Sequence, residues 1–223
     1  MSAAGALPAE VTVSVDTLGD AWLDVAERIL ADGRPSTYDA LPILEVAHAT
    51  LDVARPDSAD PVIERFADSE RLAWMRANFT DHRRVAALGD AASYASRLYD
   101  YGRAGRDQVE WVVERLRTDP LSRSATITTF EPLLDTSYIP CVSLLDFWIP
   151  AEAVELVVYA HSIDFGAKGY GNLVELATLQ EHVALRLGRP VGRLRFLVKS
   201  AHVYDTEQDY VRRILQERAA RPE

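Results

Sequence analysis

Four runs rich in β-branched and aromatic residues fill the second half of the chain and most constrain what it can fold into. They span residues 125–130, 142–149, 154–161 and 194–204. The second and third are separated only by Pro150-Ala151-Glu152, so they predict two strands joined by a turn. A long, mostly apolar helix is expected between the third and fourth runs, at residues 172–187. This combination predicts an α+β domain in which helices cover a sheet.

The first half adds helices and one more strand. An apolar stripe at helical spacing predicts a helix at residues 19–31, with Gly33 placed where a helix should stop. Alternation predicts a strand at residues 43–53. Further helices are expected at residues 69–78, 108–117 and 207–218. No repeat or linker divides the chain, so residues 1–223 are predicted to form a single domain.

Composition and charge narrow the functional classes. The net charge of −10 argues against nucleic acid or an anionic membrane as a partner. No apolar run approaches a membrane span, and the first residues lack the pattern of a signal peptide, so the cytoplasm is the expected compartment. One cysteine excludes an internal disulfide, and no pair among the five histidines has metal-ligand spacing, so no metal site is expected.

Cys141, in Ile139-Pro140-Cys141-Val142, is the candidate nucleophile. A lone cysteine at the start of a strand is usually a small buried apolar residue. A reactive thiol needs a neighbouring cation that lowers its pKa. Arg123 and His161 are the candidates for that cation.

Three further groups carry polar side chains in suggestive positions. His202 and Tyr204 share one face of a strand end, where they could bind a sugar hydroxyl. Ser162 and Asp164 share a face before a glycine-bearing loop. Asn172 fits a plain N-cap, but its carboxamide could also pair with the N3–H and O4 edge of uracil. Each group alone also fits a purely structural role.

The order of these motifs resembles the active-site series of the thymidylate synthase family. Pro-Cys, a strand pair, Ser-x-Asp, an asparagine opening a helix, and His-x-Tyr follow one another as in that family. Upstream, Asp119-Pro120-Leu121-Ser122-Arg123 resembles Asp-Pro-x-Ser-Arg-Arg, and Asp107-Gln108 is similar to the family's Asp-Gln. Residues 94–98 resemble its tyrosine-bearing stretch. The match covers residues 94–204, about half the chain.

The resemblance implies a thymidylate synthase-like α+β fold with a mixed or antiparallel sheet, and a homodimer formed through the sheet. It also implies one-carbon transfer from 5,10-methylenetetrahydrofolate to C5 of a pyrimidine nucleoside monophosphate. Cys141 would add to C6 of the pyrimidine. Asn172 would read the base, Asp164 would orient the loop and the base, and Tyr94 would help remove the C5 proton. For the family's glutamate general base the first choice is Glu45, followed by Glu64.

The resemblance further implies the substrate contacts. His202 and Tyr204 would hold the sugar, and Ser162 would hold the phosphate together with Arg123 from the partner subunit of the dimer. The family's phosphate loop, Arg-Thr-Gly-Thr-Gly, is absent, and Arg34 is the substitute expected for its arginine. His161 replaces the arginine before Ser-x-Asp and is expected to contact substrate there. Fewer guanidinium groups should bind a dianion less tightly.

Two departures bear on the product. The tryptophans that the family carries before its tyrosine segment are absent, and so is the long tail that closes over the folate. A closed site delivers hydride to the exocyclic methylene intermediate and gives a methyl group, whereas water gives hydroxymethyl. The sequence therefore favours a pyrimidine nucleotide hydroxymethylase, a group that includes enzymes of nucleoside-antibiotic pathways.

Three alternatives compete with this hypothesis. One is a thymidylate synthase proper, which converts dUMP to dTMP. Another is a catalytically degenerate nucleotide-binding relative, which the lost arginines favour and the retained Cys141, Asn172, His202 and Tyr204 oppose. A Cys-His hydrolase is disfavoured, because no glycine-rich nucleophile elbow surrounds Cys141. Base, sugar and product are left open by the sequence.

Overall fold

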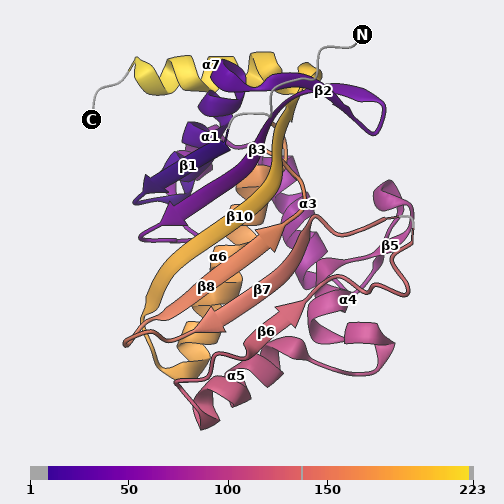
Figure 1. Cartoon of the computed structure of the whole chain (residues 1–223), viewed down its shortest axis with the longest axis vertical. Helices are drawn as coiled ribbons and strands as arrows, with labels where there is room; N and C mark the ends of the chain where they lie inside the picture. Colours follow the sequence, from indigo (N-terminus) through magenta and orange to yellow (C-terminus); the bar gives the residue numbers. More distant parts are fainter. Residues whose placement is uncertain (1–9, 137, 221–223) are drawn as a thin grey trace.

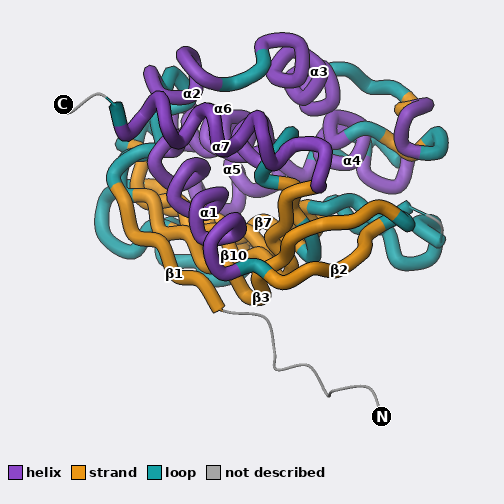
Figure 2. The backbone as a smooth tube through the Cα atoms, turned by 90° about the horizontal axis from the view of Figure 1, so that it is seen from above, coloured by secondary structure: helices purple, strands orange, loops and turns teal. Residues whose placement is uncertain are grey.

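A computed structural model describes residues 10–136 and 138–220, which form a mixed sheet with helices on one face (Figures 1 and 2). The strand order is β1-β3-β10-β8-β7-β6, with β2 paired to β3 and β9 to β10. Both parallel and antiparallel pairs occur. The strands are β1 (Glu10–Val15), β2 (Arg34–Tyr38), β3 (Leu41–Val53), β6 (Ala125–Thr128), β7 (Val142–Trp148), β8 (Val154–Ala160), β9 (Ile163–Asp164) and β10 (Val191–Tyr204), with a separate hairpin of β4 (Arg84–Val85) and β5 (Ala91–Ala92).

The helices cover the sheet with apolar stripes. α1 buries Trp22, Val25 and Ile29 at helical spacing, and the side chain of Thr17 caps its first turn. α6 is buried on most of its surface because it lies between the sheet and the outer helices. The helices are α1 (Leu18–Asp32), α2 (Pro61–Phe66), α3 (Ser69–Thr80), α4 (Tyr94–Tyr99), α5 (Gln108–Thr118), α6 (Gly169–Leu187) and α7 (Gln208–Ala219), with short 3-10 turns at Ala86–Leu88, Tyr101–Arg103 and Asp205–Glu207.

The other face of the sheet is free of helices within the described residues (Figure 2). A row of side chains crosses four strands there, because Thr50 pairs with Leu197, Leu197 with Tyr159, and Tyr159 with Leu144. The last three are 42%, 39% and 37% exposed. We call Thr50, Leu197, Tyr159 and Leu144 the outer row.

The predicted fold class is confirmed, with several differences in its elements. The sequence analysis did not expect β1, β2, the β4–β5 hairpin, β9, α2 or α4. The expected N-cap role of Asn172 is wrong, because α6 begins at Gly169 and Lys168 occupies the N-cap position. None of the helices in the described part of the chain has the length and apolar character needed to cross a membrane.

Candidate active site

Several neighbouring strands begin or end at the same end of the sheet, and they bring polar residues together there. Cys141 precedes β7 and His161 follows β8, and these strands are antiparallel, so both residues lie at the same edge. The His161 N–H donates to the Cys141 carbonyl at 3.0 Å. His202 lies near the end of β10, which is parallel to β8, so it lies at the same end of the sheet. Glu45, near the start of the antiparallel β3, pairs directly with His202. The motifs that are far apart in sequence therefore meet here.

Ser162, Asp164 and His202 form the buried centre of this edge. Asp164 pairs with His202 in the β9–β10 ladder, and Ser162 Oγ lies 3.3 Å from His202 Nδ1. Asp164 Oδ1 accepts hydrogen bonds from the N–H groups of Gly166 and Ala167 at 2.9 and 3.2 Å. Burial raises the pKa of Asp164 to about 6 and lowers the pKa of His202 to about 4. His202 is therefore neutral at neutral pH.

The buried polar atoms that lack a partner among the described residues include Asn172 Oδ1 and His202 Nε2. The Lys168 carbonyl accepts from Asn172 N at 3.0 Å and from Nδ2 at 3.1 Å. Because a carbonyl can only accept, this contact fixes the orientation of the amide and leaves Oδ1 as a free acceptor. A buried unsatisfied polar atom costs about 1–3 kcal/mol, so two in one site are typical of groups that wait for a ligand.

Cys141 is surrounded by tyrosines and faces one cation. Burial raises the pKa of its thiol, while the Lys168 ammonium and a hydrogen bond from Tyr138 act to lower it. Burial, followed by the neighbouring Cys141, also raises the pKa values of Tyr38, Tyr94 and Tyr138. The pattern of the sequence did not reveal Lys168, Tyr38 or Tyr138 as site residues.

Tyr204 and Tyr94 lie where their motifs predicted. Burial, followed by the negative charge of Asp164, raises the pKa of Tyr204 to about 12. Its ring meets the His202 ring edge-on at 5.1 Å between centroids. The Tyr94 hydroxyl accepts from Val142 N at 3.0 Å, immediately after Cys141. The Tyr94 hydroxyl therefore borders the candidate nucleophile, and the Tyr204 ring borders His202.

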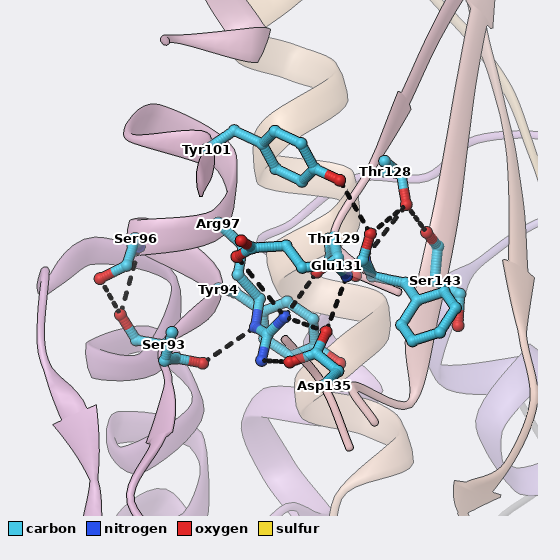
Figure 3. A network of polar contacts seen from close by, with 12 residues as sticks. Ser93, Tyr94, Ser96, Arg97, Tyr101, Thr128, Thr129, Glu131, Asp135 and Ser143 are labelled. Atoms are coloured by element: carbon cyan, nitrogen blue, oxygen red, sulfur yellow. Dashed lines mark hydrogen bonds and ion pairs between the residues drawn. The ribbon is translucent and has the colours of Figure 1, made fainter. Parts of the chain in front are cut away.

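A buried arginine holds the loop that leads to Cys141 (Figure 3). Arg97, on α4, is 2% exposed and donates to both carboxylate oxygens of Asp135 at 2.7 and 2.8 Å. It also donates to the carbonyls of Ala92 and Thr129 at 3.0 and 2.7 Å. The helix that carries Tyr94 is thus tied to the segment that precedes Cys141.

Other predicted residues lie away from Cys141 in this chain. Arg123 precedes β6, whose Ala125 pairs with Phe147, six residues along β7 from Cys141. At about 3.4 Å per residue, Arg123 therefore lies roughly 20 Å or more from Cys141. Glu64 is exposed on α2. The suggestion that Arg123 supplies the cation for Cys141 within one chain is therefore wrong, and Lys168 takes that place.

Glu45, Arg34 and His161 occupy the margins of the site. Arg34 and His202 both pair with Glu45 across the β2-β3-β10 ladder, so these three side chains share a face. Ser200 Oγ donates to the Glu45 carboxylate. His161 continues the alternation of Tyr159, which places it on the outer face, where the Lys199 ammonium and, above all, burial lower its pKa. His161 is therefore a neutral group beside a cation.

Comparison with known proteins agrees with the geometry. The family model described as thymidylate synthase matches residues 59–223. A relative from Methanosarcina acetivorans is 35% identical over 154 residues, which cover 66% of this chain and 70% of that protein. A relative from Methanothermobacter marburgensis is 29% identical over 211 residues, which cover 86% and 92%. Both relatives carry the name "Putative thymidylate synthase".

Proposed function

The chain belongs to the thymidylate synthase family, and from that premise we propose that it transfers a one-carbon unit to C5 of a pyrimidine nucleoside monophosphate. The observation that carries the proposal is the free, oriented Oδ1 of Asn172 in the same buried site as Cys141 and His202. An acceptor held in this way suits the N–H edge of a pyrimidine. Uracil offers N3–H and cytosine offers its amine, so either base can satisfy it.

In the proposed reaction the Cys141 thiolate bonds to C6, and the electron pair moves to C5. C5 would then bond to the methylene carbon, and the C5 proton would leave through ordered water near Tyr94, with Glu45 as the proposed general base. The bond between the methylene carbon and the folate nitrogen breaks, so tetrahydrofolate leaves, and water adds to the exocyclic methylene as the thiolate leaves C6. The Lys168 ammonium stabilises the thiolate before attack and when it leaves C6. Asp164, braced by two backbone N–H groups, keeps the loop before α6 in position.

The proposed co-substrate is 5,10-methylenetetrahydrofolate, which supplies the methylene group when bound. The fit rests on the pair formed by Lys168 and Trp74, whose ammonium and ring centroid are 6.0 Å apart. An aromatic ring beside a cation suits a ligand that carries both an aromatic ring and a carboxylate, as a p-aminobenzoylglutamate does. Trp74 on α3 would hold the aromatic ring, beside the Lys168 ammonium that faces Cys141.

Of the two products, we propose the hydroxymethylated nucleotide. Thr80 and Arg83 stand in the segment where the family's tryptophans are missing, and Thr80 is exposed. Without those tryptophans water can reach the exocyclic methylene, and water addition gives hydroxymethyl. A thymidylate synthase proper is the second candidate.

We also propose a homodimer formed through the outer face of the sheet. The outer row supplies an apolar stripe for self-association. His161 and Lys199 lie on the same face, close to the candidate phosphate-binding Ser162. In such a dimer Arg123 of each subunit would reach the site of its partner.

A product assay tests the proposal. The protein is incubated with 5,10-methylenetetrahydrofolate and, separately, dUMP, UMP, dCMP or CMP, and the masses of nucleotide and folate products are measured. A hydroxymethylated nucleotide with tetrahydrofolate supports the proposal, and a methylated one with dihydrofolate makes the chain a synthase proper. The Cys141→Ala variant should form no product but still bind nucleotide. A folded wild-type protein that converts none of the four nucleotides would leave only the degenerate binding relative.

A further inference from the structure

Beside Ser162, His161 stands where the family carries an arginine before Ser-x-Asp. His202 is neutral at neutral pH, and Arg123 of the same chain lies roughly 20 Å or more away by strand spacing. Yet a nucleotide bound with its base at Asn172 and its sugar at His202 must direct its phosphate toward Ser162. Some group must therefore hold the phosphate in place of the missing arginine loop.

The β2–β3 hairpin presents one large side chain at this point. Tyr38 pairs with Leu41 and closes a two-residue turn at Asp39 and Ala40, whose φ values are 50° and 61°. Two positive φ values are the geometry of a type I′ hairpin turn. Thr37 is exposed, whereas Tyr38 is half-buried. The hairpin therefore directs the phenol inward.

Tyr38 contacts both residues that frame this end of the site. Its ring centroid lies 5.2 Å from that of His202, at an interplanar angle of 40°. Ser162 is near enough to its hydroxyl to act to lower the pKa of the phenol, and Ser162 Oγ lies 3.3 Å from His202 Nδ1. The Tyr38 hydroxyl, Ser162 Oγ and the unpartnered His202 Nε2 thus form one polar cluster, and all three can donate a hydrogen bond.

Building on the proposed function, we propose that Tyr38 determines specificity at the sugar–phosphate end, where its hydroxyl binds the 5′-phosphate in place of the phosphate-loop arginine. Arg34 lies four residues earlier on β2, about 13 Å along the strand. It is paired across the ladder with Glu45, a neighbour of opposite charge. Tyr38 is the hairpin residue whose ring lies against His202.

The test compares nucleotide with nucleoside binding by calorimetry. The variants are Tyr38→Phe, which keeps the ring against His202, Arg34→Gln, and Thr37→Val as a matched control on the exposed side of the hairpin. The probes are dUMP with deoxyuridine, and CMP with cytidine. A hydrogen bond to a charged group contributes about 1.5–3 kcal/mol. Tyr38→Phe should therefore weaken nucleotide binding by roughly 10-fold or more, leave nucleoside binding within about twofold, and reduce the nucleotide preference.

Other outcomes overturn the inference. An equal loss for nucleotide and nucleoside would make Tyr38 a sugar or packing contact. Unchanged nucleotide binding in Tyr38→Phe, together with a large loss of nucleotide binding in Arg34→Gln, would show that Arg34 binds the phosphate. Wild-type protein that binds none of dUMP, CMP, UMP and dCMP would contradict the proposed function along with the inference, and this result is obtained before any variant is made.

Discussion

Lys168 brings a positive charge to three groups of the site, since its ammonium lowers the pKa values of Cys141, Asp164 and His202. Its backbone carbonyl also holds the Asn172 amide. Removing the charge in Lys168→Met should raise the pKa of the Cys141 thiol further, because an opposite charge nearby favours the thiolate. The midpoint of the pH dependence of iodoacetamide alkylation measures this directly and needs no substrate.

Two variants make the alkylation experiment specific. Lys168→Arg retains the charge and should keep the wild-type midpoint. Lys199→Met removes a cation from the outer face, where its ammonium acts to lower the pKa of His161, so it should also leave the midpoint unchanged. A midpoint that does not move in Lys168→Met would show that the ammonium has no influence on the thiol.

Asp164 should lower the stability of the fold at neutral pH. Its pKa is about 6 in the folded protein against 3.8 for an unperturbed group, because burial disfavours the charged form. The stability that the protonated carboxyl contributes is complete below pH 3.8 and is lost as the pH rises through 6. This difference in pKa corresponds to a loss of at most about 3 kcal/mol in the free energy of unfolding.

Asp164→Asn removes the charge while its Oδ1 can still accept from Gly166 and Ala167. In urea unfolding at pH 7.5, the variant should have a higher free energy of unfolding than wild type. This advantage should be about 1–3 kcal/mol larger than the advantage measured at pH 4. An advantage of the same size at both pH values would mean that Asp164 ionises normally in the fold. The gain would accompany a loss of activity, as expected when a strained group serves function.

At the scale of elements, the Arg97–Asp135 pair joins α4 to the segment before β7 (Figure 3). Arg97→Met would leave the Asp135 carboxylate, 9% exposed, without its partner. An unpaired buried charge costs about 3–5 kcal/mol, so urea unfolding should show a loss of that order. Arg84→Met is the control, because its ion pair with Asp90 is exposed at 3.8 Å and should matter by less than about 1 kcal/mol.

The double variant Arg97→Met with Asp135→Leu should recover much of the lost stability, because it removes both charges. No recovery would mean that the loss comes from the backbone carbonyls that Arg97 binds. The two outcomes separate the ion pair from the support of the loop.

The start of α6 shows why sequence patterns could miss part of the site. Gly169 and Gly171 are poor helix formers, so the sequence indicated a loop up to Asn172. In the fold, a Cβ on Gly171 would come 3.0 Å from the Cβ of Met75 on α3. Close packing of two helices therefore requires glycine inside α6. The same error hid Lys168, which the sequence assigned to the loop.

Residues with a sequence motif were easier to predict than those without one. Cys141, Ser162, Asp164 and His202 could be named from motif order, and strand pairing brings them together. Tyr38 belongs to no such motif. Its strand contains Pro35, and its turn has no glycine or asparagine, so no local signal predicted a hairpin there. By contrast, β1 alternates Val11, Val13 and Val15, a pattern that could have predicted it.

At the scale of the whole molecule, the outer row should mediate self-association. Leu197→Glu places a charge at the centre of that row, between Tyr159 and Thr50. It should convert a dimer to a monomer in size-exclusion chromatography with light scattering, because a buried unpaired charge is costly. Leu185→Glu is the matched control, since Leu185 is 78% exposed on α6, away from the sheet. A monomeric wild type, or an unaffected dimer in Leu197→Glu, would contradict this interface.

The proposed dimer also predicts complementation between two inactive variants. If Arg123 serves the partner's site, Cys141→Ala and Arg123→Ala damage different halves of each shared site. A heterodimer of the two then contains one site with both defects and one intact site. Random mixing makes half of the dimers mixed, so co-expression should restore about a quarter of wild-type product formation. If Arg123 acts only within its own chain, every site in the mixture keeps one defect and no activity returns. The product assay on co-purified, differently tagged subunits separates these cases, with each variant alone as its baseline.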